Sequence, residues 1–126
     1  MRELDELFQA LEKSSFRSSF RLNRKEQEYL RSKGLSLILE HARDFVTGRL
    51  APAVISNDGK QTPFHGHPVF VAQHATACCC RGCLQKWHRI PAGRILTQDE
   101  QDYILDVLQH WFKLKVPPSL FDQHQT

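Results

Sequence analysis

The residues with the most distinctive chemistry are cysteines and histidines, which crowd into one short stretch of the 126-residue chain. All four cysteines lie between Cys78 and Cys83, and four of the seven histidines lie between His65 and His88. Thiolates and imidazoles are typical ligands of zinc in proteins. The stretch is therefore the candidate functional site.

A zinc site is the leading interpretation of this stretch. Residues 80–83 read Cys-Arg-Gly-Cys, a C-x2-C spacing that lets two thiolates bind one ion while amides of the turn hydrogen-bond to the sulfurs. Zinc needs two more ligands, and the spacing does not select them. Cys79 is not expected to join its neighbour Cys80 easily on one ion, whereas His74 and His88 are candidates. An iron–sulfur cluster would use the same thiolates.

A thiol-redox protein is a second interpretation of the same pair. A C-x2-C motif at the start of a helix places its first sulfur at the positive end of the helix dipole, and Arg81 adds a cation. Both effects would lower the pKa of Cys80 and make it nucleophilic. The βαβ pattern of thioredoxin-like proteins is absent upstream, where the sequence is helical.

A small metal-dependent nuclease of the ββα type is a third interpretation. In such a protein a strand bearing His74 would lead through a metal-binding turn into a short helix, and His74 would be the general base that activates water. Only one acidic residue, Asp58, lies between Asp44 and Asp99. The plainest alternative is that the cysteines are small buried apolar residues and the histidines have no catalytic role.

The positive charge of the chain is unevenly distributed. The net charge is +3, and residues 13–33 hold seven Lys and Arg against two Glu. Within this segment the pairs Phe16-Arg17 and Phe20-Arg21 repeat four residues apart, a spacing that stacks like side chains on one face of a helix. Such a segment could bind nucleic acid through its phosphates, and ordinary solvated charge is the alternative.

The elements around the candidate site are expected to be mainly helical. Apolar periodicity and capping residues predict helices over residues 2–13, 24–33, 36–48, 84–87 and from Thr97 to about 116. One short strand is expected over residues 68–72, leading into the Cys/His-rich turn. The interpretation is a single mainly α domain over residues 1–118 with its site at 57–93, followed by a flexible tail over 119–126.

The sequence also predicts where the protein resides. No apolar run approaches the roughly 20 residues that span a bilayer, and the acidic, amphipathic N-terminus is unlike a signal peptide. Thiols clustered within a few residues are typical of a reducing compartment. We therefore expect a cytoplasmic protein that does not interact with a membrane.

The candidate site and much of the remaining chain resemble a family of small bacterial proteins described as a domain of unknown function (DUF4186). The resemblance rests on residues 57–63, 66–76, 79–84 and 86–91, with further similarity at residues 16–20 and 97–103. The family carries no activity that could be transferred. In its pattern Cys78 and His65 are departures, so the resemblance implies as ligands Cys79, Cys80, Cys83, His67, His74 and His88.

Overall fold

The computed structural model describes residues 1–120, and over this range the chain forms seven α-helices and no strand. The mainly α prediction is confirmed. In chain order the elements are α1 (Leu4–Glu12), α2 (Ser15–Ser18), α3 (Arg24–Lys33), α4 (Leu35–Phe45), the π-helical turn η1 (Val46–Leu50), α5 (Pro68–Ala75), α6 (Arg81–His88), α7 (Gln98–Lys115) and the 3-10 turn η2 (Pro118–Leu120).

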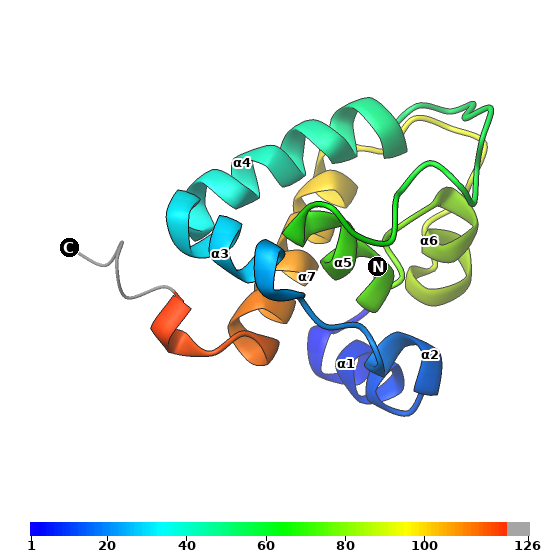
Figure 1. Cartoon of the computed structure of the whole chain (residues 1–126). Helices are drawn as coiled ribbons and strands as arrows, with labels where there is room; N and C mark the ends of the chain where they lie inside the picture. The colour runs from blue at the N-terminus through cyan, green and yellow to red at the C-terminus, as the bar shows by residue number, and fades with distance from the viewer. Residues whose placement is uncertain (121–126) are drawn as a thin grey trace.

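Helix α5 is the centre of the fold, and it occupies the segment where we predicted a strand. It packs against α2, α3, α4 and α7 (Figure 1). His67 caps it by accepting the Val69 N–H, and Pro68 occupies the first turn, where no amide partner is needed. Because neighbours surround α5 on most sides, nearly all of its residues are buried. An apolar run of this kind shows no helical period, which explains why the strand prediction is wrong.

Two other helices begin where local sequence signals predicted. Asn23 and Glu26 form a capping box at the start of α3, and Thr97 and Glu100 form another at the start of α7. Both boxes use only residues three apart, so tertiary packing is not needed to specify them. Gly34 ends α3 with a positive φ of 84°, as a helix-stopping glycine is expected to do.

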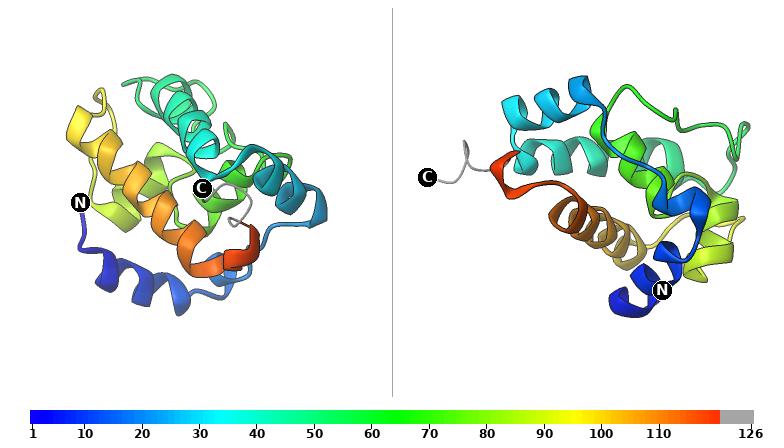
Figure 2. Two further views of the ribbon diagram at one scale, coloured as in Figure 1. Left: turned by 90° about the vertical axis from the view of Figure 1, so that its left-hand side faces the viewer. Right: turned by 60° about the horizontal axis from the view of Figure 1, so that its bottom comes forward.

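Helix α7 runs along one side of the molecule and covers α4 and α5 (Figures 1 and 2). After α7, the 3-10 turn η2 returns Leu120 to the core, where it is buried. The predicted tail begins at residue 119, and its residues 121–126 lie outside the part that the structure describes. Over residues 1–120, no helix combines the length and apolar character that crossing a membrane requires.

Candidate metal centre

The first turn of α6 carries two of the candidate cysteines and is capped twice. Cys80 precedes the helix in an extended conformation, and its Sγ accepts the Cys83 N–H at 3.3 Å. The carboxylate of Asp58, from the loop between η1 and α5, accepts the N–H groups of Arg81 at 2.8 Å and Gly82 at 3.2 Å. These bonds satisfy three amides that a helix start leaves free, and they fix the C-x2-C turn.

Three cysteine sulfurs converge at this turn. The Sγ atoms of Cys79, Cys80 and Cys83 all lie within 4.8 Å of one another, and the group could hold a metal ion. The distance between the Cys79 and Cys83 sulfurs is 3.6 Å. We expected the adjacent residues Cys79 and Cys80 not to share an ion easily. The chain bends at both residues as it turns into α6, and this bend brings their side chains to one point.

Arg17 supplies the positive charge at the sulfurs. Its guanidinium group reaches across from α2, donating through Nη1 to the His74 carbonyl at 2.7 Å and toward Cys79 Sγ at 3.7 Å. Nη2 donates to Cys83 Sγ at 3.3 Å. The same guanidinium lies over the rings of Phe16 and Trp87, at 5.0 Å and 5.9 Å from their centroids. Sequence reasoning did not place Arg17 at the site, although the Phe-Arg repeat marked this segment.

The three thiols differ in acidity because they hydrogen-bond to one another. Hydrogen bonds from Cys79 and Cys80, with a further one from Arg17, lower the pKa of the Cys83 thiol. Donating hydrogen bonds to its neighbours, together with burial, raises the pKa of Cys79. Cys83 is therefore the most acidic of the three thiols, because thiol and guanidinium donors point at its sulfur.

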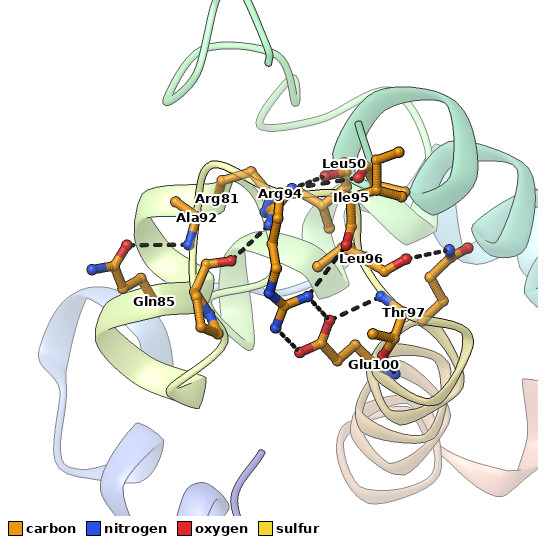
Figure 3. Close-up of polar contacts among 12 residues, drawn as sticks. Leu50, Arg81, Gln85, Ala92, Arg94, Ile95, Leu96, Thr97 and Glu100 are labelled. Carbon is orange, nitrogen blue, oxygen red and sulfur yellow. Dashed lines mark hydrogen bonds and ion pairs between the residues drawn. The ribbon is translucent and has the colours of Figure 1, made fainter. Parts of the chain in front are cut away.

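Arg81 lies inside the C-x2-C motif but does not face the sulfurs. Its buried guanidinium donates to the carbonyls of the last residue of η1 and of the two residues that follow, and to the Pro91 carbonyl at 2.7 Å. Figure 3 shows its contact with Leu50. A hydrogen bond from Cys79 lowers the pKa of Cys80, but a hydrogen bond to Cys83 and burial outweigh it, so that this pKa is raised. The prediction that Arg81 would help to lower the pKa of Cys80 is wrong, because backbone oxygens hold its charge elsewhere.

The loop that follows α6 is held to α7 by a separate ion pair. Arg94 makes two contacts with the Glu100 carboxylate, at 2.8 and 2.6 Å (Figure 3). The hydrogen bonds that Arg94 donates lower the pKa of Glu100 to about 2. This pair joins the loop that contains Pro91, an acceptor of Arg81, to the α7 capping box.

His74 lies on α5 beside the sulfur group, but its Nε2 is engaged elsewhere. Nε2 donates to the Thr62 carbonyl at 2.9 Å, and the ring stacks against Phe64 at 4.3 Å and Phe20 at 5.5 Å. Burial lowers the pKa of this imidazole. The ββα nuclease interpretation placed His74 on a strand, whereas the described residues contain no strand and put it in a helix.

His88 lies in a fully buried hydrogen-bond network. Its Nε2 donates to the Thr76 carbonyl at 2.8 Å, and its Nδ1 accepts from the Tyr103 hydroxyl at 2.7 Å. The Cys78 sulfur, also fully buried, lies 3.4 Å from Nε2. Burial lowers the pKa of His88 to about 4 and raises the pKa of Cys78 to about 12. Both side chains are therefore neutral at neutral pH.

His67 lies at the other end of α5 from the sulfurs. Its Nδ1 accepts the Val69 N–H at 3.0 Å, and its Nε2 lies 3.1 Å from His41 Nδ1. Burial, reinforced by His41, lowers its pKa to about 4. Within residues 1–120, the group of ligand atoms close enough for one ion consists of the three cysteines and includes no imidazole.

Comparison with known proteins places the chain in a family. No solved structure matches it. The profile of the family described as a domain of unknown function (DUF4186) matches residues 5–113, which include the whole sulfur group and the elements that hold it. The resemblance identified from the sequence is thus confirmed, and the chain belongs to the DUF4186 family.

Proposed function

We propose that this protein binds one zinc ion through the thiolates of Cys79, Cys80 and Cys83. The observation that carries the proposal is the convergence of three sulfurs, two of them 3.6 Å apart. Tetrahedral zinc with Zn–S bonds of about 2.3 Å places its sulfurs about 3.8 Å apart. The spacing of the sulfurs therefore fits ligands that share a single ion.

The donor set favours zinc over other metals and over clusters. Thiolates are soft ligands that select zinc, copper(I) or iron–sulfur clusters over magnesium and calcium. Iron–sulfur clusters are usually held by four cysteines, whereas this group contains three close sulfurs. A single zinc ion requires the least rearrangement of the group.

The charges around the sulfurs also support the proposal. Three thiolates and one Zn²⁺ carry a net charge of −1, which the guanidinium of Arg17 neutralises. Its N–H groups already point at two of the sulfurs, as the outer hydrogen-bonding partners of metal ligands do. Arg17 would therefore stabilise the metal-bound form of the group.

Three protein ligands leave one position of a tetrahedral zinc for water, a substrate or a partner, an arrangement typical of zinc sites that perform chemistry. His74 could complete the site through Nε2 only if its hydrogen bond to the Thr62 carbonyl broke. The bond is buried, so this exchange would leave a carbonyl without a partner. We therefore propose the open, three-cysteine form.

Metal analysis of protein purified without chelator tests the proposal. We expect about one zinc per chain, and we expect Cys80→Ser and Cys83→Ser to lose it, because zinc is held far less well by a hydroxyl than by a thiolate. Cys78→Ala is the matched control, since this cysteine belongs to the same run but not to the group. If the wild-type protein contained no metal and its Cys83 reacted rapidly with iodoacetamide, the result would instead support the thiol-redox interpretation.

A further inference from the structure

A cluster of aromatic side chains lies exposed beside the sulfur group. Phe16 and Phe64 are 52% and 56% exposed. Phe20 lies between them, edge-to-face with Phe16 at 5.1 Å and parallel to Phe64 at 6.1 Å with an interplanar angle of 4°. Solvent-exposed phenylalanines that are held in fixed orientations are suited to stack against a flat ligand.

The backbone that carries Phe16 and Phe20 is strongly basic. Residues 13–25 contain five Lys or Arg and four Ser but no Asp or Glu. The first acid after this segment, Glu26, is buried and accepts the N–H groups of Asn23 and Gly66. The last acid before it, Glu12, is paired with Lys115 at 2.9 Å. The segment therefore contains no acid of its own, although Arg17 faces the sulfur group and Glu12 also interacts electrostatically with Arg21.

The aromatic rings lie on the basic segment itself and on the loop that runs beside it. The segment that links α2 to α3 runs beside the loop before α5, as the Phe20–Phe64 stacking and the Glu26–Gly66 hydrogen bond show (Figure 1). Arg17 joins this face to the sulfur group, since its guanidinium contacts both the Phe16 ring and Cys83 Sγ. We call this surface, formed by residues 13–25 and Phe64, the Phe/Arg face.

We propose that the Phe/Arg face binds single-stranded nucleic acid. Bases would stack on Phe16 and Phe64, and the basic side chains of residues 13–25 other than Arg17 would contact the phosphates. Stacking on protein aromatics requires bases that are free of a partner strand, which favours a single strand over a duplex. The proposal does not depend on zinc, because the Phe16 and Phe64 rings and the basic side chains of the segment other than Arg17 lie outside the sulfur group.

Fluorescence anisotropy with a labelled oligo(dT), a labelled oligo(U) and a DNA duplex of equal length tests the proposal. We expect at least one single strand to bind about tenfold or more tightly than the duplex. Phe16→Ala and Phe64→Ala should each weaken single-strand binding by about fivefold or more, because one stacked base contributes about 1–3 kcal/mol. Ile95→Ala, an exposed apolar residue of the α6–α7 loop, should leave binding unchanged.

Two further variants separate stacking from charge. Phe64→Tyr keeps an aromatic ring and should retain binding. Lys25→Ala removes one phosphate contact, so the slope of log K against log salt should become less negative by about 0.7. Circular dichroism confirms that each variant folds. Equal affinity for the duplex with no effect of the Phe variants would overturn the proposal, as would no binding at about 50 mM salt, where electrostatic contacts are strong. The first result would show binding to phosphates through charge alone, and the second would make a protein partner the better explanation of the Phe/Arg face.

Discussion

Two neighbouring sets of side chains that contain cysteine have opposite characters in this molecule. Around Cys78 and His88, each imidazole nitrogen has a polar partner and both side chains are fully buried. One residue further along the chain, Cys79 begins a group of three sulfurs that share a single guanidinium and include the half-buried Cys83. The first set has the features of a core network and the second those of a ligand-binding site. Residue type and sequence proximity alone do not distinguish them.

The largest effect that would test this contrast is on stability. We expect His88→Ala to lower the free energy of unfolding by about 3–5 kcal/mol, because it opens a cavity and removes the buried hydrogen bonds of His88 with the Tyr103 hydroxyl and the Thr76 carbonyl. Urea unfolding followed by circular dichroism measures the change. His65→Ala is the control: it removes a largely exposed side chain that contacts Glu26 at 3.0 Å, and it should change stability by less than about 1 kcal/mol. Loss of zinc from a His88→Ala protein that still folds would break the distinction between the two sets.

A somewhat smaller effect should appear with pH. The pKa of His88 is about 4 in the folded protein and about 6.5 when unfolded, so the unfolded state takes up a proton first as the pH falls. Stability should therefore be complete above pH 6.5 and decline toward pH 4, by roughly 3 kcal/mol from this residue. Urea unfolding at several pH values, with chelator in every sample, follows the decline. His88→Gln should remove the part of the decline that His88 contributes. If the variant and the wild type lost stability equally as the pH falls, the imidazole of His88 would already be protonated in the core.

A third prediction tests whether Arg17 supports metal binding at the sulfur group. Arg17→Ala should weaken zinc binding by about 10–100-fold, as loss of an outer hydrogen-bonding partner of metal ligands commonly does. Competition with a chromophoric chelator measures the affinity. Arg21→Ala is the matched control, since it removes the other arginine of the Phe-Arg repeat, whose guanidinium contacts the Ser18 carbonyl instead. Equal effects of the two variants would show that only general positive charge matters.

The smallest expected effect concerns the start of α6. Asp58→Ala removes the acceptor of two helix N–H groups and should lower stability by about 1 kcal/mol, with Asp106→Ala on the exposed face of α7 as the control. Because Asp58 fixes the C-x2-C turn, zinc affinity should fall in the same variant. If stability fell by the expected amount while the zinc affinity stayed unchanged, the turn would be held in place by its cysteines alone.

Features encoded by neighbouring residues could be predicted from the sequence. The Asn23 N-cap of α3, the α7 capping box and the Gly34 stop depend on residues a few positions apart, and each lies where it was expected. The α5 segment could not be assigned in this way, because burial on most sides removes the periodicity that identifies a helix.

The candidate site was only partly predictable for a similar reason. The concentration of cysteines identified the correct segment, but the selection of Arg17 over Arg81 depends on contacts between residues 57 or more positions apart. The histidines could not be assigned either, since the Thr62, Thr76 and Val69 backbone groups that bind them have no sequence signature.

The π-helical turn η1 has a consequence for how the length of this chain can vary. Its wider winding is closed by the bond from the Ala51 N–H to the Val46 carbonyl. At its end, the three successive carbonyls of Leu50, Ala51 and Pro52 accept hydrogen bonds from the guanidinium of Arg81. Deleting one residue from Val46–Leu50 would restore ordinary α-helical winding and rotate the following chain by about 100°. Arg81 would then lose its acceptors, and Asp58 would no longer reach α6. Insertions and deletions in the Asn57–Gln61 loop tip, on either side of Asp58, should therefore be tolerated far better than insertions and deletions in η1.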